Sequence, residues 1–396
     1  MTTPSSLILP QGHLATFAPE EYARRLSRLR EAMRARGLDA MILFAQESLH
    51  YLTGYDTSGY VFFQAAVLPL EGEMTLLTRR PDVAQARDTS NITDIRVWYN
   101  AVDENPAADL RGIVLEKGLK GAKIGVELFT YGLTAGQWRN VEREMAGVCT
   151  LEDGSELVRN LRLVKSEAEL FHVREAGRLA DLAMIAVRDR AKPGIYSGEL
   201  SGVAISTVLE NGGDLPAEVP IINSGTRAVY GRGVLGAYRL EENDQIMAEF
   251  GASHRRYMVC IERTLILGKL SDEQASMFSV VGDTLQAMME AFRPGAALGD
   301  VDREHRRVLD ASAFAGDRYG ACGYSLGATY APTWMDVPPM IYSGNPLVME
   351  PGMVFFPHVM LGAVGTRRAV GMGHTVIVTK TGCEILSRIP VAPLMA

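Results

Sequence analysis

Apolar residues in the first 150 positions alternate between helical and strand-like spacing. From Glu20 to Arg36 they recur about one helical turn apart, and Gly37 follows as a helix stop. The largely apolar run from Asp39 to Phe44 is typical of a buried strand. Further strands are predicted at 74–78, 95–99 and 123–127, and further helices at 107–117 and 134–145. This alternation predicts an α/β domain with its own sheet.

The pattern changes near residue 158, which predicts one domain at residues 1–158 and a second at 159–396. Ser166 and Glu169 have the spacing of a capping box, which predicts the start of a long helix just after the boundary. An inward apolar stripe then continues along this helix at helical spacing.

The second domain is predicted to contain an internal duplication. A long helix ends before Pro193-Gly194, and another that starts near Asp272 ends before Pro294-Gly295. A further helix and then β-rich sequence follow each of them, with the β-rich segments at 245–267 and 353–379. Two such αα-then-ββ halves predict a pseudo-twofold, and their interface is the natural place for a binding cleft.

Composition narrows the class of partner. The net charge of −7 argues against nucleic acid or an anionic membrane as the main partner, because both require a basic surface. No run approaches 18 apolar residues, and Met1–Gln11 lacks the pattern of a secretory signal. The four cysteines are scattered without a CxxC pair. We therefore expect a cytoplasmic protein that acts on a small molecule.

Three short runs carry a resemblance to a known family. They are Ala248–Ala252, Ile261–Thr264 and Glu350–Val354, in the same order and spacing around the helix–Pro-Gly–helix duplication. Together they resemble the creatinase/prolidase (M24, pita-bread) family. The resemblance implies an amino-terminal α/β domain and an α+β catalytic domain with a curved antiparallel sheet. It also implies a homodimer.

The resemblance predicts that the metal ligands of the family are lost. Its metallopeptidase members hold two metal ions with two Asp, one His and two Glu. The matching positions here are Glu249, Cys260, Tyr324, a position at or beside His358, and one near Gly373 or His374. Because only the first is still a carboxylate in its place, we expect no metal and no cofactor in the cleft. A single soft metal site formed by Glu249, Cys260 and His358 is the alternative.

Two metal-independent branches of the family are the nearer comparisons. Creatinase shares the Glu-Arg-Thr at Glu262-Arg263-Thr264, but its catalytic His falls on Arg232, which cannot exchange a proton near neutral pH. Ectoine hydrolase resembles the chain at several other motifs. These are Glu249, Arg255-Arg256-Tyr257, Gly323-Tyr324-Ser325 and Pro332-Thr333-Trp334.

Four residues are expected to carry the chemistry. Glu249 suits a nucleophile or a general base, and Glu262 is a second carboxylate that shares a strand face with Cys260. His358 and His374 are the candidate proton carriers, because the pKa of imidazole lies near working pH. The alternatives are that Glu262 pairs with a neighbouring arginine and that each histidine is an ordinary core residue.

Five further residues are expected to bind substrate. Arg232 suits a substrate carboxylate, which its guanidinium can hold through two hydrogen bonds. Tyr324 suits a developing oxyanion. Tyr257 and Trp334, from the motifs shared with ectoine hydrolase, join Cys260 as expected contacts.

These residues predict a metal-independent hydrolase of a non-peptide C–N bond in a small polar metabolite. Opening of a cyclic amidine ring, as in ectoine, is the leading reaction. The alternatives are a divergent Xaa-Pro peptidase, a creatinase-type amidinohydrolase, and an inactive pita-bread domain that binds peptides or partners.

Overall fold

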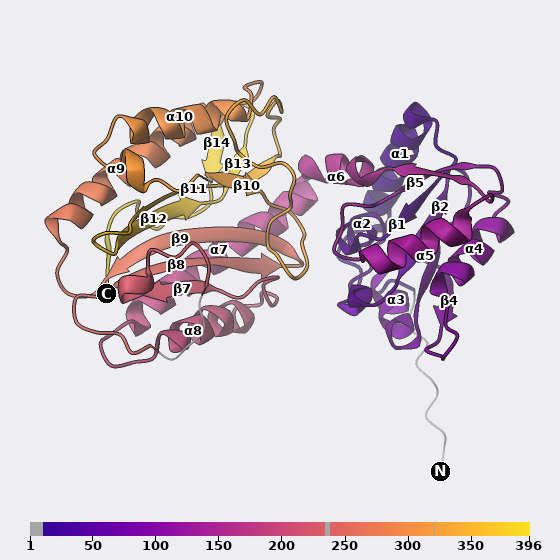
Figure 1. Ribbon diagram of the computed structural model, residues 1–396, viewed down its shortest axis with the longest axis horizontal. Coiled ribbons are helices and arrows are strands. Elements are labelled where there is room, and N and C mark those ends of the chain that lie inside the picture. Colours follow the sequence, from indigo (N-terminus) through magenta and orange to yellow (C-terminus); the bar gives the residue numbers. More distant parts are fainter. Residues whose placement is uncertain (1–10, 234–237, 321) are drawn as a thin grey trace, which may run out of the picture. The chain divides into compact units, whose positions relative to one another are not determined.

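The computed structural model describes residues 11–233, 238–320 and 322–396 (Figure 1). It divides the chain into two compact units, Met1–Arg162 and Leu163–Ala396. The domain boundary expected at residue 158 lies within helix α6 (Ser155–Leu163), four residues before the end of the first unit. Residues 1–10, which carry most of the segment without a secretory pattern, lie outside the described part of the chain.

The first unit contains a mixed six-stranded sheet in the order β4-β3-β2-β1-β5-β6. Its strands are β1 (Ala40–Leu43), β2 (Ala65–Pro69), β3 (Thr75–Arg79), β4 (Asp94–Trp98), β5 (Lys123–Val126) and β6 (Thr150–Asp153). Its other helices are α1 (Pro19–Arg36), α2 (Gln46–Thr53), α3 (Val83–Thr89), α4 (Pro106–Glu116) and α5 (Ala135–Met145). The α/β domain predicted from the hydrophobic pattern is therefore confirmed.

Strand β1 runs through the middle of this unit and is buried on both faces. Ala40 and Ile42 pack into one apolar cluster, which also contains residues of α4 and α5. Met41 and Leu43 pack into a second cluster, which contains residues of α1 and α2. Because side chains alternate along a strand, the two clusters lie on opposite faces of the sheet. The unit is thus a sheet between two helical layers.

The second unit contains a nine-stranded sheet in the order β14-β13-β11-β12-β9-β8-β7, with β10 paired to β11 and β15 paired to β9. Its strands are β7 (Ile221–Ser224), β8 (Gln245–His254), β9 (Tyr257–Ile266), β10 (Gly323–Ser325), β11 (Val354–Ala363), β12 (Arg368–His374), β13 (Val376–Val378), β14 (Cys383–Ile385) and β15 (Leu394–Met395). Its helices are α7 (Glu167–Arg190), α8 (Ser197–Glu210), α9 (Asp272–Ala291) and α10 (Gly299–Asp310). All pairings except β15–β9 are antiparallel.

The predicted duplication is present in this unit (Figure 1). Helix α7 packs on β8 and β9 with α8 beside it, and α9 packs on β11 and β12 with α10 beside it. Both long helices begin at a capping box, formed by Ser166 with Glu169 and by Ser271 with Gln274. The reciprocal hydrogen bonds of each box satisfy amide groups that the first turn of a helix leaves unpaired.

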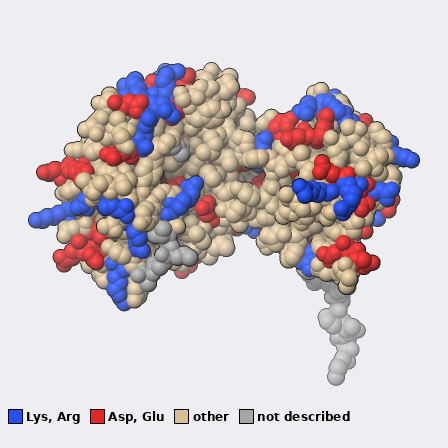
Figure 2. Space-filling model, in the orientation of Figure 1, with Lys and Arg blue, Asp and Glu red and all other residues tan. Residues whose placement is uncertain are grey.

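Charged residues of both signs are interspersed on the face shown in Figure 2. On that face the acidic residues are therefore not gathered in one field. In the described ranges, no helix is both long enough and apolar enough to cross a membrane.

Candidate active site

Four strands of the second unit place their residues in one row across the sheet. Glu249 of β8 lies directly opposite Glu262 of β9, and Glu262 lies opposite Gly373 of β12. Gly373 in turn lies opposite His358 of β11. Residues directly opposite each other on neighbouring strands point to the same face of a sheet. Glu249, Glu262 and His358 therefore share one face, although up to 109 residues separate them in the chain.

Two glycines of β12 make room for the acidic and basic side chains in this row. A Cβ atom on Gly371 would overlap the carboxylate of Glu262, and one on Gly373 would collide with the side chain of His358. Across this gap, Glu262 Oε2 approaches His358 Nδ1 to 3.4 Å. Glu262 is fully buried, whereas the side chain of His358 is 13% exposed. The sequence analysis did not identify the role of these glycines.

Glu249 is held by a short chain of hydrogen bonds from aromatic side chains. The hydroxyl of Tyr324 donates to Glu249 Oε1 at 3.1 Å, and the indole nitrogen of Trp334 donates to the hydroxyl of Tyr324 at 2.7 Å. Tyr324 lies on β10 opposite Phe356 of β11, and the ring of Phe356 stacks on His358 with 5.3 Å between centroids. These contacts bring Tyr324 and Trp334 into the same site as the row of charged residues.

The surroundings bring Glu249 and His358 into the range of acid–base chemistry. Burial, followed by the negative charge of Glu262, raises the pKa of Glu249 to about 7, although His358 and Tyr324 oppose the shift. Burial alone would lower the pKa of His358. The contact with Glu262 and the charge of Glu249 outweigh it, so the pKa of His358 is raised. A carboxyl whose pKa is about 7 and an imidazole whose pKa is raised can exchange protons with a bound molecule.

Cys260 shares the strand face of Glu262, as expected, and is buried. Burial, and then the charge of Glu249, raise the pKa of its thiol well above the usual range. Because the thiolate is the reactive form, this environment disfavours Cys260 as a nucleophile.

Arg232 is exposed, on the loop that follows β7, and donates to the carbonyl of Gly231 at 3.1 Å. Its charge still acts on Glu249 and His358. Glu218, which the sequence analysis missed, is half-buried in the same region. Its carboxyl is hydrogen-bonded to the backbone of Trp334, and burial raises its pKa. Glu218 lies in an irregular segment without periodicity or motif, so no pattern in the sequence indicated it.

His374 lies away from this site, which corrects the expected catalytic set. It follows Gly373 along β12 and lies opposite Ile261, so it points to the other face of the sheet. There its Nε2 lies 3.2 Å from the sulfur of Met289 on α9. Burial, and then the charge of Arg263, lower the pKa of His374 to about 3. It is a neutral core histidine that faces the helices.

Tyr257 also lies away from the site, which corrects the expected substrate contacts. Its hydroxyl donates to Glu169 Oε1 on α7 at 2.9 Å, and its ring stacks on His172 of the same helix. Tyr257 and Glu262 occupy positions of opposite parity on β9, and alternation along the strand directs them to opposite faces. The motif that suggested Tyr257 thus belongs to the packing between the sheet and α7.

The side chains at the family's metal positions do not fit a two-metal centre. They are a carboxylate, a thiol, a phenol, an imidazole and a glycine, at Glu249, Cys260, Tyr324, His358 and Gly373. Paired divalent ions in such sites require several carboxylate oxygens that can bridge them. At Gly373 a side chain of any size would collide with His358, so the packing leaves no room for a further carboxylate.

Known proteins resemble the chain along almost its whole length. Residues 172–380 match the family described as metallopeptidase family M24, and residues 25–164 match the creatinase/prolidase N-terminal domain. The ectoine hydrolase of Halomonas elongata is 27% identical over 391 residues, which cover 94% of this chain and 97% of that protein. The Xaa-Pro dipeptidase of Pyrococcus horikoshii is 23% identical over 371 residues, which cover 92% of this chain and 97% of that one.

The solved prolidase of Thermococcus sibiricus superimposes with a TM-score of 0.85 at 18% identity, covering 95% of this chain and 99% of its own. This likeness confirms the expected fold, an amino-terminal α/β domain and a pita-bread domain of two αα-ββ halves. Because the M24 match spans more than half of the sequence, the chain belongs to metallopeptidase family M24, with an amino-terminal domain of the creatinase/prolidase type.

Proposed function

We propose that this M24 hydrolase opens a C–N bond of a small cyclic amidine of the ectoine type, with no metal ion in the cleft. One observation carries the proposal. Within the described part of the chain, Glu262 Oε2 and His358 Nδ1 approach each other to 3.4 Å without a hydrogen bond, and Glu262 Oε1 makes none either, although all three atoms are buried. Buried polar atoms are nearly always satisfied, so a set of exceptions on one face indicates that a bound molecule supplies the partners.

The row of residues supports a hydrolysis in which the protein supplies every proton. Ionised Glu249 attacks the amidine carbon, or removes a proton from the water that does, while Tyr324 steadies its carboxylate. The imidazolium of His358, held beside Glu262, donates a proton to the ring nitrogen as its bond to carbon breaks. Water is added overall, and the products are an amide and a free amine.

Two further residues match a substrate that carries a carboxylate. Arg232 supplies positive charge near Glu249 and His358, and a guanidinium can hold a substrate carboxylate through two hydrogen bonds. The ring of Trp334 packs against Gly251 of β8 and forms an apolar wall. A Cβ atom added to Gly251 would lie 3.6 Å from the nearest ring atom of Trp334. A planar amidine ring with one carboxylate suits an apolar wall beside a cationic side chain.

The comparisons leave a peptidase as the second candidate. Proteins named Xaa-Pro dipeptidase are 23–24% identical to the chain, close to the 27% of the ectoine hydrolase. What favours the amidine is the donor set in the cleft, where Tyr324 and Gly373 stand at positions that metallopeptidases need for metal ligands.

The two candidates are separated by assaying the full-length protein on ectoine, creatine and a Xaa-Pro dipeptide, each with and without a strong chelator. We expect ring opening of ectoine or a close cyclic amidine at the same rate in both conditions. Dipeptide cleavage that chelation abolishes and added Mn²⁺ or Co²⁺ restores would establish the peptidase instead. Ectoine turnover that requires added metal would retain the substrate class and overturn the mechanism.

A further inference from the structure

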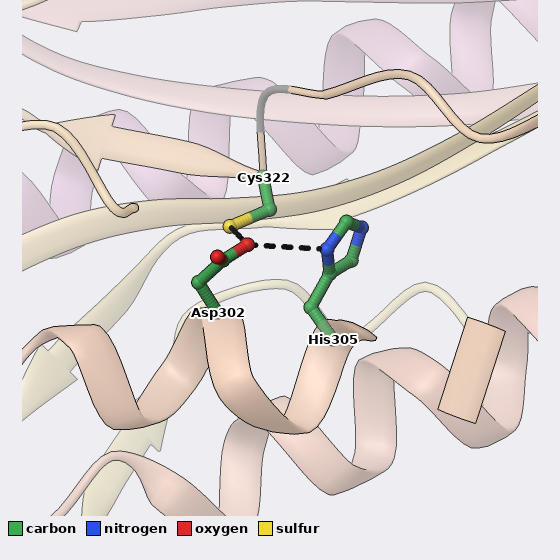
Figure 3. Close-up of side chains that lie close together, drawn as sticks. All are labelled: Asp302, His305 and Cys322. Carbon is green, nitrogen blue, oxygen red and sulfur yellow. Dashed lines mark hydrogen bonds and ion pairs between the residues drawn. The ribbon is translucent and has the colours of Figure 1, made fainter. Parts of the chain in front are cut away.

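A second cluster of reactive side chains lies on the helical side of the same unit (Figure 3). Asp302 and His305 lie one turn apart on α10, and Cys322 immediately precedes β10. The exposed fractions of Asp302, His305 and Cys322 are 1%, 1% and 0%. Within the described ranges, this is the one group of three or more His, Cys, Asp or Glu residues whose ligand atoms all lie within 4.8 Å of one another.

His305 is left without hydrogen bonds in this interior. Neither of its ring nitrogens has a partner, and Nδ1 approaches Asp302 Oδ1 only to 3.4 Å, beyond the usual hydrogen-bond length. An imidazole left without hydrogen bonds in a dry interior is costly, and a ring nitrogen in this position is available to bind a metal ion.

Two of the three spacings between the ligand atoms match a tetrahedral metal, and all three atoms lie within 4.8 Å of one another. Bonds of about 2.0–2.3 Å to zinc place neighbouring ligand atoms about 3.3–3.6 Å apart. Cys322 Sγ lies 3.3 Å from Asp302 Oδ1, and His305 Nδ1 lies 3.4 Å from the same oxygen. Figure 3 shows the three side chains converging from the helix and from the segment above it.

The neighbours of the cluster fit the same assignment. Arg306 donates to the other oxygen of Asp302, Oδ2, at 2.6 Å, so Oδ1 faces the thiol and the imidazole. Such an outer partner orients a carboxylate ligand. Binding of the ion requires the thiol of Cys322 to release its proton to solvent, because the thiolate is the ligand.

We propose that Asp302, His305 and Cys322 bind one divalent transition-metal ion of the zinc class, at a site separate from the catalytic cleft. The ion ties α10 to the strands that carry the cleft residues. The carbonyl of Cys322 accepts a hydrogen bond from the backbone of His358 at 3.1 Å, and Tyr324 lies two residues further along the chain. The ion stabilises this part of the fold and takes no part in hydrolysis.

Co²⁺ is the probe, added to the full-length, reduced, metal-free protein while the thiolate-to-cobalt absorption band is recorded. We expect the band to saturate at one equivalent in the wild type. It should be lost in Cys322→Ser and retained in Cys260→Ser, a matched change of a buried cysteine in the cleft. Zn²⁺ should raise the melting temperature of the wild type by about 5 °C and leave that of Cys322→Ser unchanged.

His305→Ala gives an independent reading if Cys322→Ser does not fold. It keeps the thiol, and we expect it to weaken Co²⁺ binding about 100-fold or more.

A wild-type protein without a saturable band would overturn the site. A band lost in Cys260→Ser but kept in Cys322→Ser would move the metal to the cleft, against both this site and the metal-free mechanism. A metal at Cys322 together with metal-dependent peptidase activity would keep the site, but it would refute both the metal-free mechanism and the purely structural role of the ion.

Discussion

At the scale of single residues, Glu249 holds a position that disfavours its charge. Burial and the neighbouring Glu262 both oppose ionisation, and the hydrogen bond from Tyr324 offsets only part of this cost. A buried carboxyl whose ionisation is disfavoured in this way is typical of a functional site, because a pKa near neutrality suits proton transfer. Two predictions follow from its chemistry and its energetics.

Replacing Glu249 with Gln keeps the shape of the side chain and removes its charge. We expect turnover to fall by about two to four orders of magnitude, the usual effect of removing a general base. The matched control is Glu242→Gln, an exposed carboxylate seven residues earlier, which should behave as wild type. Turnover of Glu249→Gln within about threefold of wild type would contradict the assigned role.

The same substitution should stabilise the fold, and more so at high pH. The pKa of Glu249 is raised from 4.5 to about 7 in the folded state, so the folded protein binds more protons than the unfolded chain between these values. The contribution of Glu249 to the free energy of unfolding is therefore fully present below pH 4.5 and is lost as the pH rises through 7. Chemical denaturation should show Glu249→Gln gaining on the wild type across this window, up to about 3 kcal/mol by pH 8. An equal difference at pH 5 and pH 8 would show that the pKa is not raised.

At the scale of elements, strand β12 sets the width of the site. Its residues Gly371 and Gly373 face the side chains of Glu262 and His358 without adding atoms of their own. The carboxylate and the imidazole can therefore meet across an intervening strand, at 3.4 Å. At Gly373, the position matched to a metal ligand of metallopeptidases, the space that a side chain would need is occupied by His358 and Phe356.

Replacing Gly371 with Ala tests this spacing. The new methyl group would displace the carboxylate of Glu262, and displacement of a catalytic group by about 1 Å can cost about 100-fold in rate. We expect a loss of that order in kcat. Gly365→Ala is the control, because a Cβ at Gly365 meets no atom within 4 Å. Wild-type kcat in Gly371→Ala would show that the position of Glu262 does not matter for catalysis.

The elements also show where a hydrophobic pattern is sufficient for prediction. Helix α1 and the two long helices α7 and α9 were expected within a residue or two, because periodicity and capping are local features. Strand β6 was not predicted. Its residues Thr150–Asp153 lie at the edge of the sheet, half-exposed, and show no apolar alternation. Strand β2 was not predicted either. It is buried and apolar throughout, so its five residues show no alternation of apolar and polar positions.

At the scale of the whole molecule, the resemblance to creatinases and prolidases predicts a homodimer. In the first unit, Phe129 and Tyr131 expose 65% and 66% of their surface, and aromatic residues of this kind are enriched at interfaces. We expect light scattering at micromolar concentration to give about twice the chain mass of 43.2 kDa. A mass of one chain under these conditions would exclude a stable dimer.

The sequence by itself determined the family, its two-domain fold and the duplicated helices, because motifs, periodicity and capping depend on residues close together in the chain. It named Glu249, Glu262, His358 and Tyr324 only through the resemblance, and their arrangement on one face follows from pairing between strands far apart in the chain. Only the tertiary structure decided which face each side chain occupies. His374 and Gly373 are adjacent in sequence, yet one faces the helices and the other the cleft. That outcome depends on the register between strands more than 100 residues apart, and a shift of one residue reverses it.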